Sequence, residues 1–410
     1  MPIVVGEHAV EEGIEFCKRR RFSKYLLVAD DNTYRVLGKR VHDALLEQDW
    51  DVIPVILNPE GLHADNVALA RVFAAYDGQP RMFIAVGSGT ITDTARFTSH
   101  RSRNPFISFP TAASVDAYTS KNAAVTIGEM KGSVYCLAPE AVFTDIQTIV
   151  ESPNFLTASG FGDLLGKFTS SSDWKYTHLI WEADFDPDIY TRTLGAALKA
   201  QENTEGIVSR DPQAMTAMME AQFETGFCMA EFGNSAPASG GEHHIAHVWE
   251  MMFHWEGREG LYHGSAVGVS AVLEAGWYEK LRGLTKENAA RLLETVPVPS
   301  RKDQEARIRE TLPEIAEDLI ARNPIYLRLA DPAVHKKVSD KILKRWEAIQ
   351  DAAACVPAAG EMRAWLEKMG GAAAGEDLGL TPQQAEIGAE FGHYLRERFS
   401  MNILRKLFGW

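Results

Sequence analysis

The run Arg81-Met-Phe-Ile-Ala-Val86 leads directly into Gly87-Ser88-Gly89-Thr90-Ile91-Thr92-Asp93, and together they predict a strand, a glycine turn and a helix. Its first part is short and apolar, which is typical of a buried strand in a parallel sheet. Glycines follow at once, and a helical pattern continues through Ala95 and Phe97. A glycine turn between strand and helix lets the backbone approach a pyrophosphate, and the helix N-terminus offers N–H groups to its charge. The same turn also occurs in α/β proteins that bind no nucleotide.

Similar apolar runs alternate with helical patterns over the first 150 residues, at 25–29, 52–56, 106–109, 134–137 and 141–144. This alternation indicates a parallel sheet with helices on both faces. After Glu151-Ser-Pro153, helical periodicity dominates almost to the C-terminus. We therefore predict an α/β, Rossmann-like dinucleotide-binding domain at 1–150. We also predict an all-α metal- and substrate-binding domain at 151–410.

Acidic residues end the strand predicted at 25–29, in the sequence Asp30-Asp31-Asn32-Thr33. A carboxylate at the end of an early strand can bind the ribose hydroxyls of a dinucleotide and repel a 2′-phosphate. The alternative is a carboxylate that caps a helix or lies in a loop. The sequence leaves both interpretations of Asp30 open.

Histidines gather in two segments of the second half, Glu242-His243-His-Ile-Ala-His247 and Tyr262-His263. With Asp163 of an earlier segment, two imidazoles could bind one divalent ion and leave coordination positions open, as catalytic metal sites do. His243 and His247 are four residues apart, so on a helix both rings project from one face, whereas His244 would project about 100° away. The alternative is a pair of structural helix histidines beside an unrelated third one.

Five motifs, in this order, resemble the sn-glycerol-1-phosphate dehydrogenases of the iron-containing alcohol and polyol dehydrogenase superfamily. They are AVGSGTITDTAR (85–96), FPTAASVDAYTS (109–120), SGFGDLLGKFTSSSDWKY (159–176), SGGEHHIAH (239–247) and LYHGSAVGV (261–269). The resemblance spans about residues 20–275 and is weaker in the C-terminal part. It implies the group III polyol dehydrogenase architecture, which is shared with 3-dehydroquinate synthase. This chain departs from the common family pattern at Gly241, where that pattern has serine, and in the extra His244.

The resemblance also implies roles for individual residues, motif by motif. The implied metal ligands are Asp163, His243 and His263. The implied cofactor-binding residues, besides Asp30, are Gly87, Ser88, Gly89, Thr90 and Asp93 at the pyrophosphate and Thr111, Ser114 and Ser120 around the nicotinamide. Asp116 and His247 are implied to face the substrate as catalytic residues.

The activity that the resemblance implies is the NAD(P)H-dependent, metal-assisted and reversible reduction of dihydroxyacetone phosphate to sn-glycerol 1-phosphate. The substrate phosphate needs a cation, and Lys167 and Lys121 are the candidates. Lys167 lies four residues after Asp163, so a plain ion pair between them is an equal alternative. The rival activities are a glycerol or polyol dehydrogenase and a 3-dehydroquinate synthase-like lyase. Zinc, nickel and iron all accept imidazole with carboxylate, so the metal stays open.

Composition sets further limits on what the protein binds and where it works. A formal net charge of −14 over 410 residues argues against a nucleic-acid surface. The four cysteines are scattered without CxxC spacing, as in a reduced cytoplasmic protein. We expect neither a signal peptide nor a membrane span. The basic, amphipathic stretch 394–410 predicts a terminal helix packed on its own domain or on a second subunit, with membrane contact as the alternative. We expect a cytoplasmic homodimer or larger homo-oligomer.

Overall fold

The computed structural model describes residues 1–128 and 130–410 and divides the chain into two compact units. The first unit comprises residues 1–164 and 198–235, and the second comprises residues 165–197 and 236–410. Helices α7 (Asn154–Trp181) and α8 (Pro187–Glu202) each contribute residues to both units.

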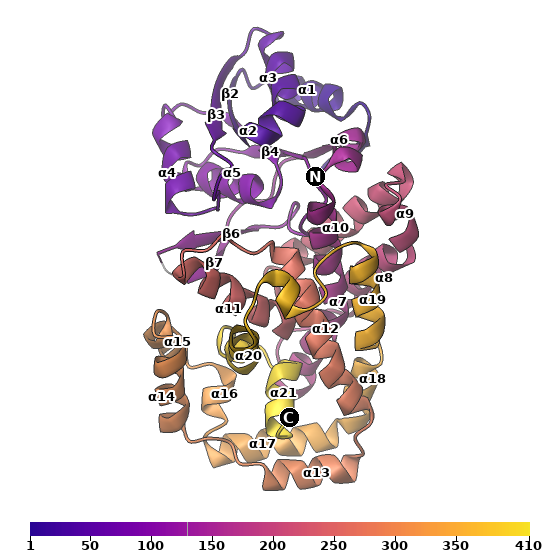
Figure 1. Cartoon of the computed structure of the whole chain (residues 1–410). Coiled ribbons are helices and arrows are strands. Elements are labelled where there is room, and N and C mark those ends of the chain that lie inside the picture. Colours follow the sequence, from indigo (N-terminus) through magenta and orange to yellow (C-terminus); the bar gives the residue numbers. More distant parts are fainter. Residues whose placement is uncertain (129) are drawn as a thin grey trace. The chain divides into compact units, whose positions relative to one another are not determined.

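A six-stranded sheet, parallel throughout, organises the first unit in the order β1-β8-β5-β4-β2-β3. Of its strands, β2, β3 and β4 are labelled in Figure 1. Its strands are β1 (Ile3–Gly6), β2 (Lys24–Asp30), β3 (Asp51–Leu57), β4 (Met82–Gly87), β5 (Phe106–Pro110) and β8 (Val142–Asp145). The predicted parallel α/β architecture is therefore confirmed. The run predicted at 134–137 is an exception, because β7 (Met130–Tyr135) pairs antiparallel with β6 (Asn122–Ile127) in a separate hairpin.

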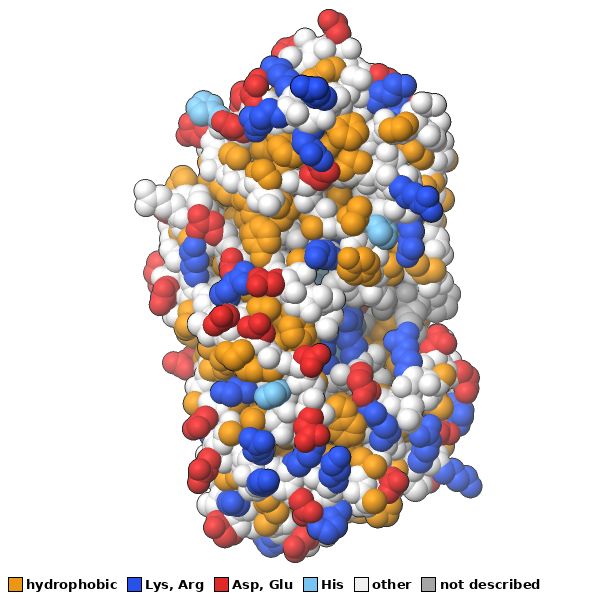
Figure 2. Space-filling view, turned by 180° about the vertical axis from the view of Figure 1, so that it is seen from behind, with side chains coloured by type: hydrophobic (Ala, Val, Ile, Leu, Met, Phe, Trp, Pro, Cys, Tyr) orange, Lys and Arg blue, Asp and Glu red, His pale blue; other side chains and the backbone are white. Residues whose placement is uncertain are grey.

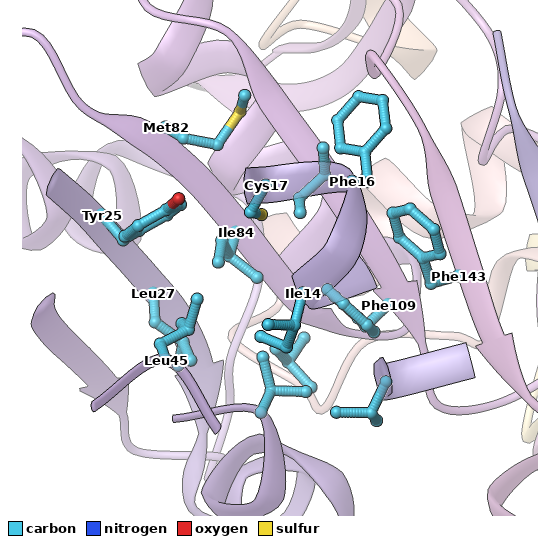
Figure 3. Packing of buried hydrophobic residues seen from close by; sticks show 14 of the residues in the cluster. Ile14, Phe16, Cys17, Tyr25, Leu27, Leu45, Met82, Ile84, Phe109 and Phe143 are labelled. Atoms are coloured by element: carbon cyan, nitrogen blue, oxygen red, sulfur yellow. The ribbon is translucent and has the colours of Figure 1, made fainter. Parts of the chain in front are cut away.

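Helices cover both faces of this sheet because successive strand residues point to opposite faces. Tyr25 and Leu27 of β2 pack in one cluster with α1 (Ala9–Arg20) and α3 (Lys39–Leu46), whereas Leu26 packs on the other face with α4 (Asn66–Ala75) and α5 (Gly89–Arg101). Figure 3 shows the first cluster, in which the aromatic rings of Phe16 and Phe143 have their centroids 5.7 Å apart. The short helices α2 (Asp31–Thr33) and η1 (Tyr34–Gly38) connect β2 to α3.

The strand order reverses between β2 and β4, which are neighbours in the sheet. The chain leaves β2 toward β3 on one side and leaves β4 toward β5 on the other. Open α/β sheets bind ligands outside the carboxyl ends of their strands at such a switch point. The register pairs Val28 with Ala85, so two residues further on Asp30 lies level with Gly87. The fold thus places the two predicted cofactor-binding segments side by side.

Helical segments that follow the last strand, β8, also belong to the first unit. They are α6 (Ile146–Glu151), the beginning of α7, the end of α8, α9 (Thr204–Val208) and α10 (Pro212–Phe232). Helix α10 packs against the loop 111–120: Gln222 donates a hydrogen bond to the Ala113 carbonyl (3.0 Å), and Thr119 donates one to the Phe223 carbonyl (2.7 Å). The boundary at 150/151 therefore marks where the strands end, and the functional division placed there stays a prediction.

Helices alone form the second unit, all of whose residues are described. After the shared segments of α7 and α8 they are η2 (Ala236–Ala238), α11 (Gly241–Trp255), α12 (His263–Arg282), α13 (Lys286–Thr295), α14 (Arg301–Thr311), α15 (Ala316–Arg322), α16 (Ile325–Arg328), α17 (Pro332–Lys344), α18 (Trp346–Ala353), α19 (Ala359–Lys368), η3 (Gly375–Leu378), α20 (Pro382–Phe391), η4 (Gly392–Tyr394) and α21 (Met401–Leu407). The predicted helical C-terminal region is confirmed.

The C-terminal helix α21 is part of the core of the second unit. Ile403, Leu404 and Leu407 are buried, and the backbone N–H of Met401 donates to Asp173 on α7 (2.6 Å). No helix within residues 1–128 and 130–410 has the length and apolar character needed to cross a membrane. On the face shown in Figure 2, acidic and basic side chains are interspersed.

Candidate functional site

The strand-to-helix turn lies at the carboxyl end of β4, as its sequence predicts. Strand β4 ends at Gly87, and α5 begins at Gly89 after the extended residue Ser88. A Cβ atom at Gly89 would lie 3.2 Å from Val115, so the absence of a side chain lets the loop 111–120 pack against the turn. The first turn of α5, with Thr90, presents its N-terminus at the switch point of the sheet. This arrangement can bind a pyrophosphate through backbone N–H groups.

Asp30 lies beside this turn and caps α2. Its Oδ1 accepts hydrogen bonds from the backbone N–H groups of Asn32 (2.8 Å) and Thr33 (2.9 Å), and the Thr33 hydroxyl accepts one from the Asp30 N–H (2.9 Å). The capping role left open by the sequence is thus present. Ribose binding stays a prediction, and it would fall to the other oxygen, Oδ2.

Asp93 anchors the loop between β5 and β6. Its carboxylate pairs with the fully buried guanidinium of Arg96 (2.7 Å), which donates to the carbonyls of Ala117 and Tyr118. This network holds the loop against α5. Asp93 therefore has a structural role whether or not it also contacts a cofactor.

The polar residues predicted around the nicotinamide lie in that same loop. The Thr111 N–H donates to the Gly87 carbonyl (3.3 Å), and the Ser114 hydroxyl lies 3.3 Å from that of Tyr118. The Ser120 hydroxyl donates to the Asn122 carbonyl (3.1 Å), which occupies it locally. Lys121 is half-buried just before β6.

Three histidines of the second unit form one cluster. The ring centroid of His263, the first residue of α12, lies 5.2 Å from that of His243 and 5.3 Å from that of His247, both on α11. The rings of His247 and His263 are stacked with an interplanar angle of 18°. The structure thus brings together the three predicted site histidines.

Two glutamates orient these rings through the same ring nitrogen. His243 Nδ1 lies 2.7 Å from Glu242, and the Nδ1 atoms of His247 and His263 each lie 2.8 Å from Glu250. A neutral ring that donates its Nδ1 proton to a carboxylate carries its lone pair on Nε2. All three rings can therefore present Nε2 to a metal or a substrate. Burial lowers the pKa of His247 to about 3, despite the opposing effect of Glu250.

His244 is buried outside this cluster. Among the described residues neither of its ring nitrogens has a hydrogen-bond partner, and burial holds its pKa well below the usual value. Its backbone lies against η4, where a Cβ atom at Gly392 would come within 3.1 Å of the His244 carbonyl carbon. Of the two adjacent histidines, His243 is the one beside His247 and His263.

Asp163 is fully buried on α7, and its Oδ2 accepts a hydrogen bond from the backbone N–H of Asp116 (3.1 Å). One turn later on the same helical face lies Gly166. A Cβ atom there would come within 2.6 Å of Val267 and 3.9 Å of the His243 ring. Asp163 lies near the end of the part of α7 that belongs to the first unit, and Gly166 lies in the part that belongs to the second.

Lys167 is also fully buried, and its ammonium group donates to the Ala238 carbonyl (3.0 Å). The charge of Lys167 acts on Glu242. Burial alone would raise the pKa of that carboxyl, but the hydrogen bond from His243, the N–H of Gly240 and the charge of Lys167 outweigh it and lower the pKa. Lys167 thus has a structural role, and its contact with a substrate phosphate stays a prediction.

Sequence reasoning missed three residues of this region: Glu242, Glu250 and Arg396. Glu250 lies three residues after His247 on a helix, a spacing that permits such a contact. Arg396 follows η4 in the basic C-terminal segment, and its charge contributes to the lowered pKa of His247. The basic character of the segment was visible, but nothing local linked it to a histidine far earlier in the chain.

Comparisons with known proteins identify the family of this chain. Residues 4–153 match the family model described as iron-containing alcohol dehydrogenase. The chain is 30% identical over 400 residues to a glycerol-1-phosphate dehydrogenase (NAD(P)+) of Halalkalibacterium halodurans, covering 97% of this chain and 90% of the relative. It is 34% identical over 337 residues to the enzyme of the same name from Bacillus subtilis, covering 79% and 82%.

Among solved structures, the alcohol dehydrogenase from Oenococcus oeni superimposes with a TM-score of 0.64 at 18% identity, covering 100% of this chain and 97% of that one. This similarity supports the fold alone. The full-length sequence similarity goes further, and it shows that the chain belongs to the glycerol-1-phosphate dehydrogenase (NAD(P)+) family of iron-containing alcohol dehydrogenases.

Proposed function

We propose that the protein is an NAD(P)-dependent oxidoreductase that interconverts dihydroxyacetone phosphate and sn-glycerol 1-phosphate. The observation that carries this proposal is the similarity to two glycerol-1-phosphate dehydrogenases over most of the chain. It is supported by the glycine turn at the switch point of the sheet and by the histidine cluster. The cytoplasm is the proposed location, and a homo-oligomer is the proposed assembly.

We propose Asp163, His243 and His263 as the protein ligands of one divalent metal ion. The donor set fits such an ion, because the carboxylates at Nδ1 leave the lone pair of both rings on Nε2. Ligand atoms of His247, Glu250 and His263 also lie within 4.8 Å of one another. That second set is a poorer candidate, since both oxygens of Glu250 already accept from ring nitrogens.

Bound there, the metal would act as a Lewis acid toward the substrate carbonyl oxygen, which gains negative charge during reduction. The residues of the chain supply orientation and proton transfer. His247, neutral and held by Glu250 at Nδ1, carries on Nε2 the lone pair that can accept the hydroxyl proton when the alcohol is oxidised. In the reduction, Nε2 would first take up a proton and then donate it to the substrate oxygen. We assign Asp116 a position beside the substrate, where its backbone also orients Asp163.

Cofactor binding is proposed at the carboxyl ends of β2 and β4. The N-terminus of α5 would bind the pyrophosphate through the backbone of Gly87, Ser88 and Gly89. Asp30, level with Gly87, would accept the adenine ribose hydroxyls. We retain Thr90, Asp93, Thr111, Ser114 and Ser120 as further cofactor-binding candidates.

The substrate phosphate requires a cation, and Arg396 joins Lys167 and Lys121 as a candidate. Arg396 lies close enough to His247 for its charge to lower the pKa of that ring. Its guanidinium can bind a phosphate with two parallel hydrogen bonds.

The test is NADH oxidation by purified, metal-loaded protein with dihydroxyacetone phosphate and dihydroxyacetone side by side. We expect turnover of the phosphorylated ketone at much higher kcat/KM. Equal reduction of both ketones would favour a glycerol dehydrogenase. No reduction of either, together with phosphate release from a sugar-acid phosphate without net NADH change, would favour a dehydroquinate synthase-like lyase.

A further inference from the structure

A single carboxylate connects the two histidines that stack in the site. Glu250 Oε2 accepts from His247 Nδ1 and Glu250 Oε1 accepts from His263 Nδ1, each at 2.8 Å. His247 and Glu250 lie on the same face of α11, three residues apart, while His263 begins α12. Glu250 therefore couples one helix to the first residue of the next.

The glutamate is well suited to hold both rings at once. It is buried, with 7% of its surface exposed, so water competes little for its oxygens. A carboxylate is an acceptor only, and its two oxygens can each accept a proton from a different ring. Both rings are therefore required to carry their proton on Nδ1.

We propose that Glu250 is a positioning residue that sets the tautomer of both His247 and His263, so that the metal-ligand ring and the substrate-facing ring present Nε2 to the same place. The link to the metal rests on the function proposed above, whereas the control of tautomers rests on the two hydrogen bonds alone. Glu242 performs the same task for His243, but for that single ring.

The replacement Glu250→Gln tests this idea with almost no change in shape. The amide has one oxygen acceptor, and its NH2 group can only donate. One of the two rings must then accept at Nδ1 and move its proton to Nε2. We expect this ring to be His263, because its side chain is 23% exposed, against 12% for His247, and is freer to adjust.

Histidine tautomers of the metal-free protein are read from long-range proton–nitrogen NMR spectra at pH 8, with ¹⁵N-labelled histidine. Spectra of His247→Asn and His263→Asn assign the two rings. Wild-type protein should show both as Nδ1–H tautomers, and Glu250→Gln should show one as Nε2–H. Glu250→Asp retains two acceptor oxygens and should keep both Nδ1–H tautomers. If Glu250→Gln does not fold, Glu250→Ala replaces it, and this variant, which has no acceptor for either ring, should no longer hold both rings as Nδ1–H tautomers.

Cobalt(II) titration, followed by absorption of the bound ion, gives the second measurement. Loss of the second-sphere contact should weaken cobalt binding by about 10- to 100-fold in Glu250→Gln. The exposed Glu294 of α13 provides the matched control, and Glu294→Gln should bind cobalt like the wild type.

Folded Glu250→Gln that retains both Nδ1–H tautomers would overturn the proposal. A shifted His263 tautomer with unchanged cobalt affinity would overturn its link to the metal. If the wild-type protein itself binds no cobalt, the proposed metal site fails, yet the tautomer measurement still decides the role of Glu250.

Discussion

Asp30 has two proposed roles that a pair of substitutions can separate. Its Oδ1 caps α2 through two backbone N–H groups, and its charge would repel the 2′-phosphate of NADPH. Asp30→Ser keeps a good capping oxygen and removes the charge, whereas Asp30→Ala removes both. Asp31→Ser is the matched control, because Asp31 is exposed and follows the cap.

Each of the two roles has an expected magnitude. Loss of the cap should lower the free energy of unfolding of Asp30→Ala by about 1 kcal/mol, and Asp30→Ser should lose only a few tenths. A carboxylate about 5 Å from a phosphate of charge about −2 repels it by roughly 1.5–3 kcal/mol in a largely aqueous setting. Both substitutions should therefore raise the kcat/KM for NADPH relative to NADH by roughly tenfold or more.

Urea unfolding measures the stability that the cap contributes, and the ratio of kcat/KM for NADPH and NADH measures the effect of the charge on cofactor selectivity. We expect the wild type to prefer NADH, and this preference should shrink as salt increases, because salt screens exposed charges. Unchanged cofactor selectivity in Asp30→Ser would refute the ribose role and leave Asp30 as a cap. A change in Asp31→Ser instead would assign the role to the neighbouring carboxylate.

Three further predictions concern the second unit. His243→Ala and His263→Ala should each lose bound metal by elemental analysis while circular dichroism stays unchanged, whereas His244→Ala should keep its metal; the opposite pattern would move the ligand to His244. Arg396→Ala should raise the KM for dihydroxyacetone phosphate by roughly ten- to a hundredfold, with little effect on dihydroxyacetone. Lys167→Met should instead reduce activity on both ketones equally and lower the unfolding midpoint in urea, because a buried ammonium is lost from the Ala238 carbonyl. If only Lys167→Met discriminates between the ketones, Lys167 and not Arg396 binds the phosphate. Burial holds the pKa of His393 well below its usual value, so its imidazole stays neutral in the folded state. In the unfolded chain the same imidazole gains a proton below about pH 6.5, and the stability of the fold therefore falls as the pH falls. Between pH 6.5 and 5, His393→Phe should lose less stability than the wild type, by up to about 2 kcal/mol in urea titrations, and equal losses would show that His393 contributes nothing to this dependence.

Five of the six strands of the parallel sheet could be predicted because each is a short apolar run bounded by turns, whereas β1 was not among the predicted runs. The same local pattern failed for 134–137, since apolar character does not tell which sheet a strand joins. The division into compact units also escaped prediction. Residues 198–235 have ordinary helical patterns, and tertiary contacts such as those of Gln222 and Phe223 place α10 against the loop 111–120.

The three site histidines could be selected from the sequence because motif order and helical spacing can both be read directly from the chain. The roles of polar residues were harder to predict. Asp30 and Asp93 both carry structural bonds that no motif records. Glu250 was missed because a glutamate on a helix is normally a solvated side chain, and its importance arises only when α12 brings His263 to its second oxygen.

The cation that would bind the substrate phosphate could not be predicted from local sequence patterns, because its position depends on tertiary structure. With a net charge of −14, the chain has no general basic field to attract an anion, so a few placed cations must do so. Lys167 is near the predicted ligand in sequence, yet turning its ammonium toward a phosphate would leave the buried Ala238 carbonyl without its donor. Arg396 is remote in sequence, but η4 packs on α11 at His244 and Ile245 and brings the following segment to the histidines. Its charge already acts on His247, so a phosphate beside Arg396 would offset the repulsion that this ring meets whenever it takes up a proton.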